Sequence, residues 1–381
     1  MGRQIKYIAI CVSLLALAPF STDAFGAQGP KPKNLHAGAV YVLTNQTTNT
    51  VAVFRRTARG MLSPAGEFPT GGTGDPTPQP PDPAIDPLAS QGALIMGRGN
   101  QYLYAVNAGS NQISVLKIKK NSVDIVDVVD SGGVRPISLA VHDDLLYVLN
   151  EGGTPNITGF TIEDGGTLTP LEGSTQPLIG GVAADPAQVG FSHDGTLLVV
   201  TEKAGNRLNT YTIDDDGLPS APIDNASNGM TPFGFAFNNA DTLVVSEASQ
   251  SAAASSYISR DDGILQIISG SVRNFQLDTC WIVTTNNGKT AFVSNTGSGT
   301  ISSYRINPGD GSLTLLNPIA ADTGMGSSPI DMDLSVNSRL LFVLLGGSQS
   351  VASFRVQKNG DLTPVDTAGG LPLGAQGIAA K

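Results

Sequence analysis

A short apolar strand pattern recurs seven times along the chain and constrains its fold more than any other feature. The copies are rich in aromatic and β-branched residues, which favour β-strands. They begin at Tyr41, Tyr104, Tyr147, Val199, Val244, Phe292 and Phe342. Their spacing is about 40 to 60 residues, which is the period of repeats that contain four strands. The chain is therefore predicted to repeat one β unit seven times.

Further strands accompany each copy of this pattern. A third strand follows every copy, at residues 50–54, 112–118, 157–162, 208–213, 254–258, 300–306 and 350–356. A tight turn and a fourth strand come next, as in residues 164–170 and 309–314, where Asp-Gly pairs accept positive φ at low cost. The chain has 45 glycines, 24 prolines and only 14% charged residues, which suits many short strands joined by tight turns. The sequence therefore predicts an all-β fold, a seven-bladed β-propeller.

The two ends of the chain indicate how the ring closes. The first copy has no strand before it, whereas residues 374–379 form a spare strand after the last repeat. If this C-terminal strand joins the N-terminal blade, no sheet edge stays open. We expect a single propeller domain over residues 37–381. Residues 71–87 contain six prolines, which exclude a central strand, and we predict a surface insertion there because the repeat resumes after it.

Residues 1–26 have the pattern of a secretory signal peptide. Arg3 and Lys6 precede an apolar run over residues 7–20, and small residues follow it. An uncleaved membrane anchor is the alternative, although the apolar run is short for a membrane span. We therefore expect an exported protein, located in the periplasm or the extracellular medium.

Charge and cysteine content limit the partners of the mature chain. Cleavage would remove Arg3, Lys6 and Asp23, which changes the net charge from −10 to −11. An acidic protein is a poor partner for nucleic acid or anionic lipid, so we expect a monomer that binds a small-molecule ligand and neither nucleic acid nor membrane. Cys280 would be the one remaining cysteine, which excludes an internal disulfide and suits a buried thiol. No motif indicates a cofactor or a metal, although a divalent cation in the channel is left open.

The first strand of each propeller blade lines the central channel, and its third residue can be aligned across the repeats. That position, the polar ring, holds Gln91, Ser138, Gln188, Gly234, Trp281, Asp331 and Gln376. We predict a substrate site there, at the mouth of the channel, with Trp281 as an apolar wall. The members expected to orient the substrate are Gln91, Gln188, Asp331 and Gln376. Alternatively, the ring only satisfies buried backbone groups and holds water.

Loops after the second strands share a face with the polar ring. This loop face carries Glu151, Glu202, Lys203, Asn206, Arg207, Glu247 and Asn295. Glu202 and Glu247 occupy the same slot in neighbouring repeats, and two carboxylates near a polar pocket can share a proton or hold a cation. We predict that these two are catalytic and that Lys203 and Arg207 bind substrate. Alternatively, the carboxylates fix the loops by hydrogen bonds to backbone amides, with Lys203 or Arg207 as counter-ion.

The histidines are expected on the face opposite to these loops. His142 and His193 lie in turns between first and second strands, and His36 lies in the N-terminal lead. None of the three reaches the predicted mouth in this register. A Ser-His-Asp catalytic triad is therefore disfavoured.

Several stretches resemble the seven-bladed β-propeller lactonase family, which includes 6-phosphogluconolactonase and carboxymuconate cyclase relatives. They include PAQVGFSHDGTLLVVTEKAGN, TPFGFAF, LVVSEA, CWIVTTNNGKTAFVSNTGSGTISSYR and SPIDMDLS, and the similarity is closest to an exported lactonase-like branch. The resemblance implies a propeller that opens lactone rings with histidine, arginine and acidic side chains around the channel mouth. The positions that would hold such histidines are Ser138 and Gln188 here. Glu202 or Glu247 would then replace histidine as the base, and Arg207 would hold a carboxylate or phosphate.

Two hypotheses of function remain. In the first, a lactonase-like enzyme hydrolyses a sugar or organic-acid lactone at the channel mouth, with water activated by Glu202 or Glu247. In the second, a non-enzymatic exported binding or scaffold propeller recognises a peptide, glycan or small molecule, which the missing histidines and an Asn-, Gly- and Ser-rich rim favour. A redox-cofactor propeller and a WD-repeat propeller are disfavoured, because the chain has one tryptophan and no recurring Trp-Asp pair.

Overall fold

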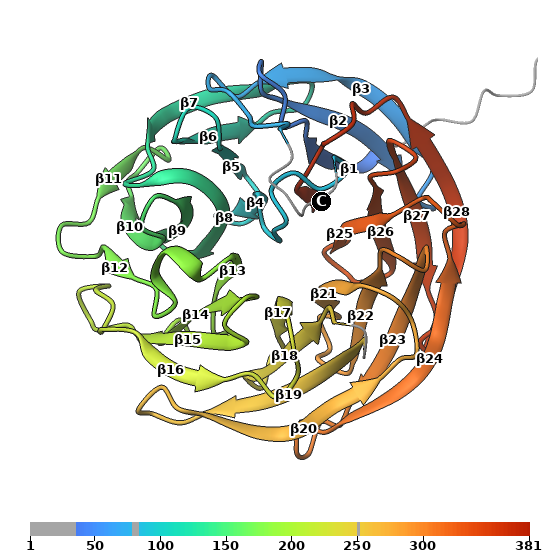
Figure 1. Cartoon of the computed structure of the whole chain (residues 1–381). Coiled ribbons are helices and arrows are strands. Elements are labelled where there is room, and N and C mark those ends of the chain that lie inside the picture. The colour runs from blue at the N-terminus through green and yellow to red at the C-terminus, as the bar shows by residue number, and fades with distance from the viewer. Residues whose placement is uncertain (1–35, 78–83, 250–251) are drawn as a thin grey trace, which may run out of the picture. The chain divides into compact units, whose positions relative to one another are not determined.

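Seven antiparallel sheets follow one another around a ring in the computed structural model, which describes residues 36–77, 84–249 and 252–381 (Figure 1). Each sheet is one blade, with its first strand nearest the centre and its fourth strand outermost. The predicted all-β, seven-bladed propeller is therefore confirmed. The 3₁₀ helix η1 (Gly181–Ala183) is the only helix in these ranges, and no helix there is long and apolar enough to cross a membrane. The predicted signal peptide, residues 1–26, lies outside the described residues.

Strands pair with their chain neighbours inside each blade. The first blade holds β29 (Ile378–Ala380), β1 (His36–Leu43), β2 (Thr50–Thr57) and β3 (Leu62–Pro69). The next three consist of β4 (Leu94–Gly97), β5 (Tyr102–Asn107), β6 (Gln112–Ile118) and β7 (Val123–Asp130); β8 (Val134–His142), β9 (Leu145–Gly152), β10 (Asn156–Ile162), β11 (Leu168–Pro170) and the short β12 (Gln176–Pro177); and β13 (Pro186–Phe191), β14 (Leu197–Glu202), β15 (Arg207–Thr212) and β16 (Ile223–Ala226). The last three consist of β17 (Pro232–Phe237), β18 (Thr242–Glu247), β19 (Ala253–Ser259) and β20 (Leu265–Arg273); β21 (Thr279–Thr284), β22 (Thr290–Asn295), β23 (Thr300–Ile306) and β24 (Leu313–Asp322); and β25 (Pro329–Leu334), β26 (Leu340–Leu345), β27 (Ser350–Val356) and β28 (Leu362–Gly369).

The second strands form the most buried layer of the ring. Every residue of β5, β14, β18 and β26 is buried. Neighbouring blades cover both faces of such a strand, which explains why the recurring sequence pattern is a continuous apolar run and not an alternating one. The predicted buried thiol is also found: Cys280 is 8% exposed, and burial raises the pKa of its thiol and makes it unreactive.

The chain closes the ring by pairing its two ends. β29 adds to β1 as an antiparallel inner strand, with Val42 opposite Ile378. Beyond the last strand pair, the Lys381 N–H donates to the Ala39 carbonyl oxygen at 2.8 Å, and the Ala39 N–H donates back at 3.1 Å. The predicted closure is confirmed, and it pairs the inner edge of the N-terminal blade.

Gly38 shows how tightly this closure is packed. A Cβ at residue 38 would lie 1.7 Å from the carbonyl oxygen of Lys381 and 2.9 Å from Cζ of Arg56. Nε of Arg56 donates to the same carbonyl oxygen at 2.7 Å. Only glycine therefore fits beside the closing strand.

Gly38→Ala is expected to lower the free energy of unfolding by about 1–3 kcal/mol, because the added methyl group overlaps the Lys381 carbonyl. Urea and thermal unfolding of the purified chain would measure the loss. Gly309→Ala is the matched control, because a Cβ there would make only an ordinary contact, 3.5 Å from Asn307. Equal stability of the two variants would contradict this account of ring closure.

Candidate functional site

A β-bulge interrupts the pairing of the inner strand in five blades, close to where that strand enters the channel. Bulges re-aim side chains, and these lie at the level of the polar ring. In β25 the residue that the bulge leaves out of the ladder is Asp331, whose φ is +28°. In a regular strand, successive side chains point to opposite faces of the sheet. The side chain of Asp331 does not have to follow this pattern.

Glutamines of the polar ring hydrogen-bond to the backbone of other blades. Gln188 donates to the Phe235 carbonyl oxygen at 3.1 Å and accepts from the Phe235 N–H at 2.7 Å. Gln91 makes the same pair of bonds with Ile282, on the far side of the channel, at 2.8 and 3.0 Å. These contacts agree with the alternative in which the ring satisfies buried backbone groups. Substrate binding by Gln91 and Gln188 stays a prediction.

Residues 86–91, here called the mouth segment, lead into β4 across the predicted channel mouth and are buried. Four long side chains from other parts of the ring hold their backbone. Arg135 donates to the Pro87 oxygen at 2.6 Å, Lys203 to the Ala89 oxygen at 3.0 Å and Trp281 Nε1 to the Ser90 oxygen at 2.8 Å, while Gln376 Oε1 accepts from the Leu88 N–H at 2.5 Å. Trp281 and Gln376 therefore hold the mouth segment in place, and the end of the predicted surface insertion is buried.

The two carboxylates predicted to be catalytic lie inside their blades, and both residues are 0% exposed. Glu202 accepts hydrogen bonds from the Gly180 N–H at 3.1 Å and from Nδ2 of Asn209 at 2.6 Å. Glu247 accepts from the Ser271 hydroxyl at 2.7 Å, and burial raises its pKa. Neither glutamate lines the cavities described below. The loop-fixing alternative accounts for these contacts, and a catalytic role for either residue stays a prediction.

Lys203 and Arg207 pair with aspartates and not with these glutamates. Nζ of Lys203 lies 3.0 Å from Asp185 Oδ1, and the Lys203 side chain is 7% exposed. Arg207 pairs with Asp224 and is 36% exposed. Lys203 is thus a buried cation at the mouth segment, whereas Arg207 lies further out on the blade. Substrate binding by either residue stays a prediction.

A cavity of about 300 Å³ lies on the loop face beside the mouth segment. This mouth-side cavity is lined by Arg135, Glu151, Gly152, Pro155, Val182, Ala183 and Asp185. Arg135 forms ion pairs with Glu151 and, at 3.1 Å, with Asp75. The Arg135 and Glu151 side chains are only 11% and 17% exposed. The cavity wall therefore holds a largely desolvated carboxylate beside a guanidinium.

Glu151 is well placed to accept a proton on this face. Burial raises its pKa, and the positive charges of Arg135 and Lys203 act in the opposite direction. A carboxyl whose pKa is raised toward neutrality is a suitable general base. Sequence reasoning placed Glu151 on the loop face but missed Arg135. The available signal was that Arg135 lies three residues before its polar-ring position, Ser138, where none of the other six repeats has a cation.

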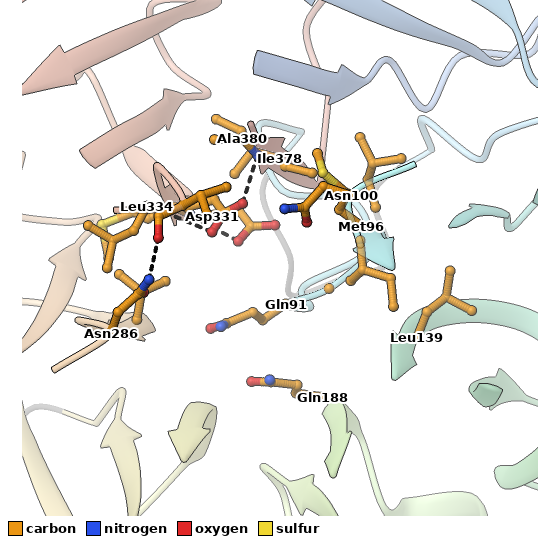
Figure 2. Close-up of a pocket in the computed structure, with 18 residues that line it drawn as sticks. Gln91, Met96, Asn100, Leu139, Gln188, Asn286, Asp331, Leu334, Ile378 and Ala380 are labelled. Atoms are coloured by element: carbon orange, nitrogen blue, oxygen red, sulfur yellow. Dashed lines mark hydrogen bonds between the residues drawn. The ribbon is translucent and has the colours of Figure 1, made fainter. Parts of the chain in front are cut away.

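The central channel has its cavity toward the opposite face. This channel cavity, of about 440 Å³, is lined by Gln91 and Gln188 and also by Asn100 and Asn286, which lie in turns between first and second strands (Figure 2). An adjoining cavity of about 400 Å³ also contains Gln188 and reaches His142 and His193. The structure thus places these two histidines on the face opposite to the loops, as expected, and beside the accessible end of the channel.

Two carboxylates of β25 line the channel cavity. Asp331 is 4% exposed, and its Oδ1 accepts from the Met332 N–H at 2.9 Å, whereas its Oδ2 has no hydrogen-bond partner among the described residues. Asp333 accepts from the amides of Leu334 and Ala380, both at 2.7 Å. Burial raises the pKa of Asp331 well above its usual range and raises that of Asp333 to about 7. Sequence reasoning selected Asp331 for this channel and did not select Asp333.

The family of the chain follows from its match to a family model. The model described as lactonase, 7-bladed beta-propeller, matches residues 93–278 and 265–374, which together span more than half of the sequence. The chain belongs to this lactonase family. None of the curated proteins matches it.

Solved structures share the fold of this lactonase propeller at low sequence identity. A putative 6-phosphogluconolactonase from Bacteroides uniformis is 17% identical with a TM-score of 0.66, and the match covers 89% of this chain and 99% of that one. A protein from Lactobacillus plantarum is 16% identical with a TM-score of 0.69, covering 90% and 99%. The periplasmic gluconolactonase of Pseudomonas aeruginosa is 13% identical with a TM-score of 0.68, covering 89% and 98%. These likenesses show a common fold.

Asp333 should make the stability of this lactonase propeller depend on pH. Its pKa is about 7 in the folded chain, against about 4 for an unfolded aspartate. The folded state therefore binds the proton more tightly, and stability falls as the pH rises from about 4 to about 7. An asparagine does not ionise, so Asp333→Asn should lack the loss of stability that Asp333 causes between about pH 4 and about pH 7. The variant should therefore unfold at a higher temperature than the wild type at pH 8. Thermal unfolding in metal-free buffer tests this, and a variant no more stable at pH 8 than the wild type would refute it.

Proposed function

We propose that this protein hydrolyses a sugar or organic-acid lactone in the mouth-side cavity, with Glu151 as the general base. The observation that carries the proposal is the Glu151–Arg135 ion pair in the wall of that cavity, with Lys203 close enough to affect the Glu151 carboxyl. Membership of the lactonase family supplies the reaction class. The predicted signal peptide supports an exported location for this reaction.

The proposed reaction needs only a base and a stabilised oxyanion. Glu151 accepts a proton from a water molecule as that water attacks the lactone carbonyl carbon. Negative charge then develops on the carbonyl oxygen, and the positive charges of Arg135 and Lys203 stabilise it. The ring C–O bond breaks, and the leaving alkoxide takes the proton back from Glu151. The product is the open-chain hydroxy acid.

Electrostatics favours the mouth-side cavity over the channel cavity for this chemistry. The channel cavity is lined by Asp331 and Asp333, and two carboxylates would oppose a developing oxyanion when they are ionised. The mouth-side cavity is also lined by two carboxylates, Glu151 and Asp185, but each of them is paired with a cation, Arg135 and Lys203 respectively. This arrangement also matches the arginine and acidic side chains that the family resemblance implies around the mouth.

A neutral sugar lactone is the first substrate to test. The solved structure from Pseudomonas aeruginosa is described as a periplasmic gluconolactonase, and it shares the fold of this chain. Arg135 already contacts Asp75, Glu151 and the Pro87 carbonyl. Three of the five N–H donors of its guanidinium are therefore in use, which leaves two for one oxygen of a lactone or of its product.

A non-enzymatic binding propeller is the second candidate, because the loop face carries exposed apolar side chains. Four connections between blades hold a large apolar residue that is more than half exposed. These are Val182 at 82%, Met230 at 62%, Phe275 at 73% and Met325 at 98%. Exposed apolar groups on one face suit recognition of a peptide.

Glu151→Gln is expected to lower the rate of lactone hydrolysis by about 10²–10⁴-fold, because it removes the general base. Proton release from a panel of sugar and organic-acid lactones measures turnover, and thermal unfolding checks that the variant is folded. In the wild type, turnover should also fall at acidic pH as Glu151, whose pKa is raised, becomes protonated.

Glu202→Gln is the matched control, because Glu202 is also a buried carboxylate on the loop face but does not line the mouth-side cavity. This control should keep its turnover. If Glu202→Gln or Glu247→Gln lost its turnover while Glu151→Gln stayed active, the general base would be Glu202 or Glu247, as predicted from sequence, and not Glu151. A folded wild type that hydrolyses no lactone of the panel would favour the binding propeller.

A further inference from the structure

We propose that the channel cavity holds one divalent cation, ligated by Asp331, Asp333 and water molecules. The cavity lies between the inner strands and extends toward the face opposite to the loops. The cation site is therefore separate from the proposed lactonase site beside the mouth segment, and it does not depend on that function.

Asp331 supplies the oxygen that points to a ligand. Its Oδ2 is buried and accepts no hydrogen bond of standard geometry from the described residues, although the Ile378 amide lies near the carboxylate and the residue lines a cavity that water can enter. Figure 2 shows its side chain near the open centre of this cavity, with Asn100 and Gln91 across from it. A buried carboxylate oxygen left without a donor is costly unless a cation or a proton occupies it.

Comparison with the rest of the polar ring sets Asp331 apart. Side chains of the other polar members bond to the backbone: Gln91 to Ile282, Ser138 to Gln91, Gln188 to Phe235, Trp281 to Ser90 and Gln376 to Leu88. Asp331 is the charged member, and its bulge turns it out of the strand ladder. Hydrogen bonds to protein groups thus satisfy the polar side chains of the ring except at Asp331, its one anionic position.

Asp333 provides a second carboxylate on the same strand and in the same cavity. Its two oxygens each accept one backbone hydrogen bond, from Leu334 and Ala380. A carboxylate has about four lone-pair directions, so Asp333 can still bind a cation directly or through water. The backbone bonds fix its position, which is how metal-ligating carboxylates are oriented.

The charged side chains near the two carboxylates do not neutralise them in the described part of the chain. Neither Asp331 nor Asp333 takes part in an ion pair within the described ranges. Asp86 adds further negative potential at Asp331. Nζ of Lys381 donates to the Asn100 oxygen at 2.8 Å at the outer end of the cavity, and Lys203 is held by Asp185 on the loop face. A bound cation would balance the negative charge in the channel.

The ligand set fits a hydrated ion of the Mg²⁺ or Mn²⁺ type. Such ions bind through one or two carboxylates and keep several waters, whereas Ca²⁺ takes six to eight oxygen ligands. No group of three or more acidic, histidine or cysteine side chains gathers as a metal cage in the described part of the chain, so water must supply the other ligands. A water occupies about 30 Å³, so a cavity of about 440 Å³ has room for an octahedral hydration shell.

Manganese binding to the chelator-stripped full chain at pH 8 tests the proposal. The electron paramagnetic resonance signal of free Mn²⁺ should fall on titration to about one ion per chain, with a dissociation constant of about 1 mM or tighter. Asp331→Asn and Asp333→Asn should each weaken binding at least about tenfold. Mn²⁺ should also raise the thermal midpoint of the wild type and leave that of Asp331→Asn unchanged.

Asp215→Asn is the control, because it removes the same charge from an exposed turn. It should bind Mn²⁺ like the wild type. Thermal unfolding without metal shows whether Asp331→Asn is folded, and replacement of an unpartnered buried carboxylate should not lower its midpoint. A wild type that leaves the Mn²⁺ signal unchanged, or a folded Asp331→Asn that binds as tightly as the wild type, would overturn the proposal.

Discussion

The buried backbone of the mouth segment needs hydrogen-bond partners, and this requirement determines which side chains lie at both ends of the channel. A buried carbonyl oxygen left without a donor costs about 1–3 kcal/mol. Three of its carbonyl oxygens therefore receive hydrogen bonds from Arg135, Lys203 and Trp281, which belong to three different blades. These bonds hold the segment across the channel mouth, and Gln91 at its end reaches the far side of the ring.

The way the mouth segment is held places cationic side chains on the loop face of the propeller and leaves in the channel two carboxylates that form no ion pair with the described residues. The side chains that satisfy the mouth segment bring Arg135 and Lys203 to the loop face, where they neighbour Glu151. The channel cavity beyond the segment keeps Asp331 and Asp333. The loop face therefore suits a reaction that develops negative charge, whereas the channel suits a positively charged ligand. A single packing requirement thus accounts for two cavities of different electrostatic character.

The repeating strands could be predicted from sequence because each copy satisfies the same local and packing rules. Buried second strands must be apolar on both faces, and a closed ring needs a spare strand at one end. The site could be predicted only in part. Glu202 and Glu247 do share a slot, but Gly180 and Ser271, which hydrogen-bond to them, lie 22 and 24 residues away at positions that strand spacing alone does not bring into register. The bulge that turns Asp331 out of its ladder is likewise a tertiary feature.

The position of the reaction product would test the central claim that the two faces have different chemistry. A crystal structure with the open-chain hydroxy acid of a sugar lactone would show where an anionic product binds. We expect the acid in the mouth-side cavity, because its two carboxylates are paired with Arg135 and Lys203, whereas the two carboxylates of the channel cavity have no ion-pair partner among the described residues. An acid bound in the channel beside Asp331 would contradict the division of charge on which this account depends.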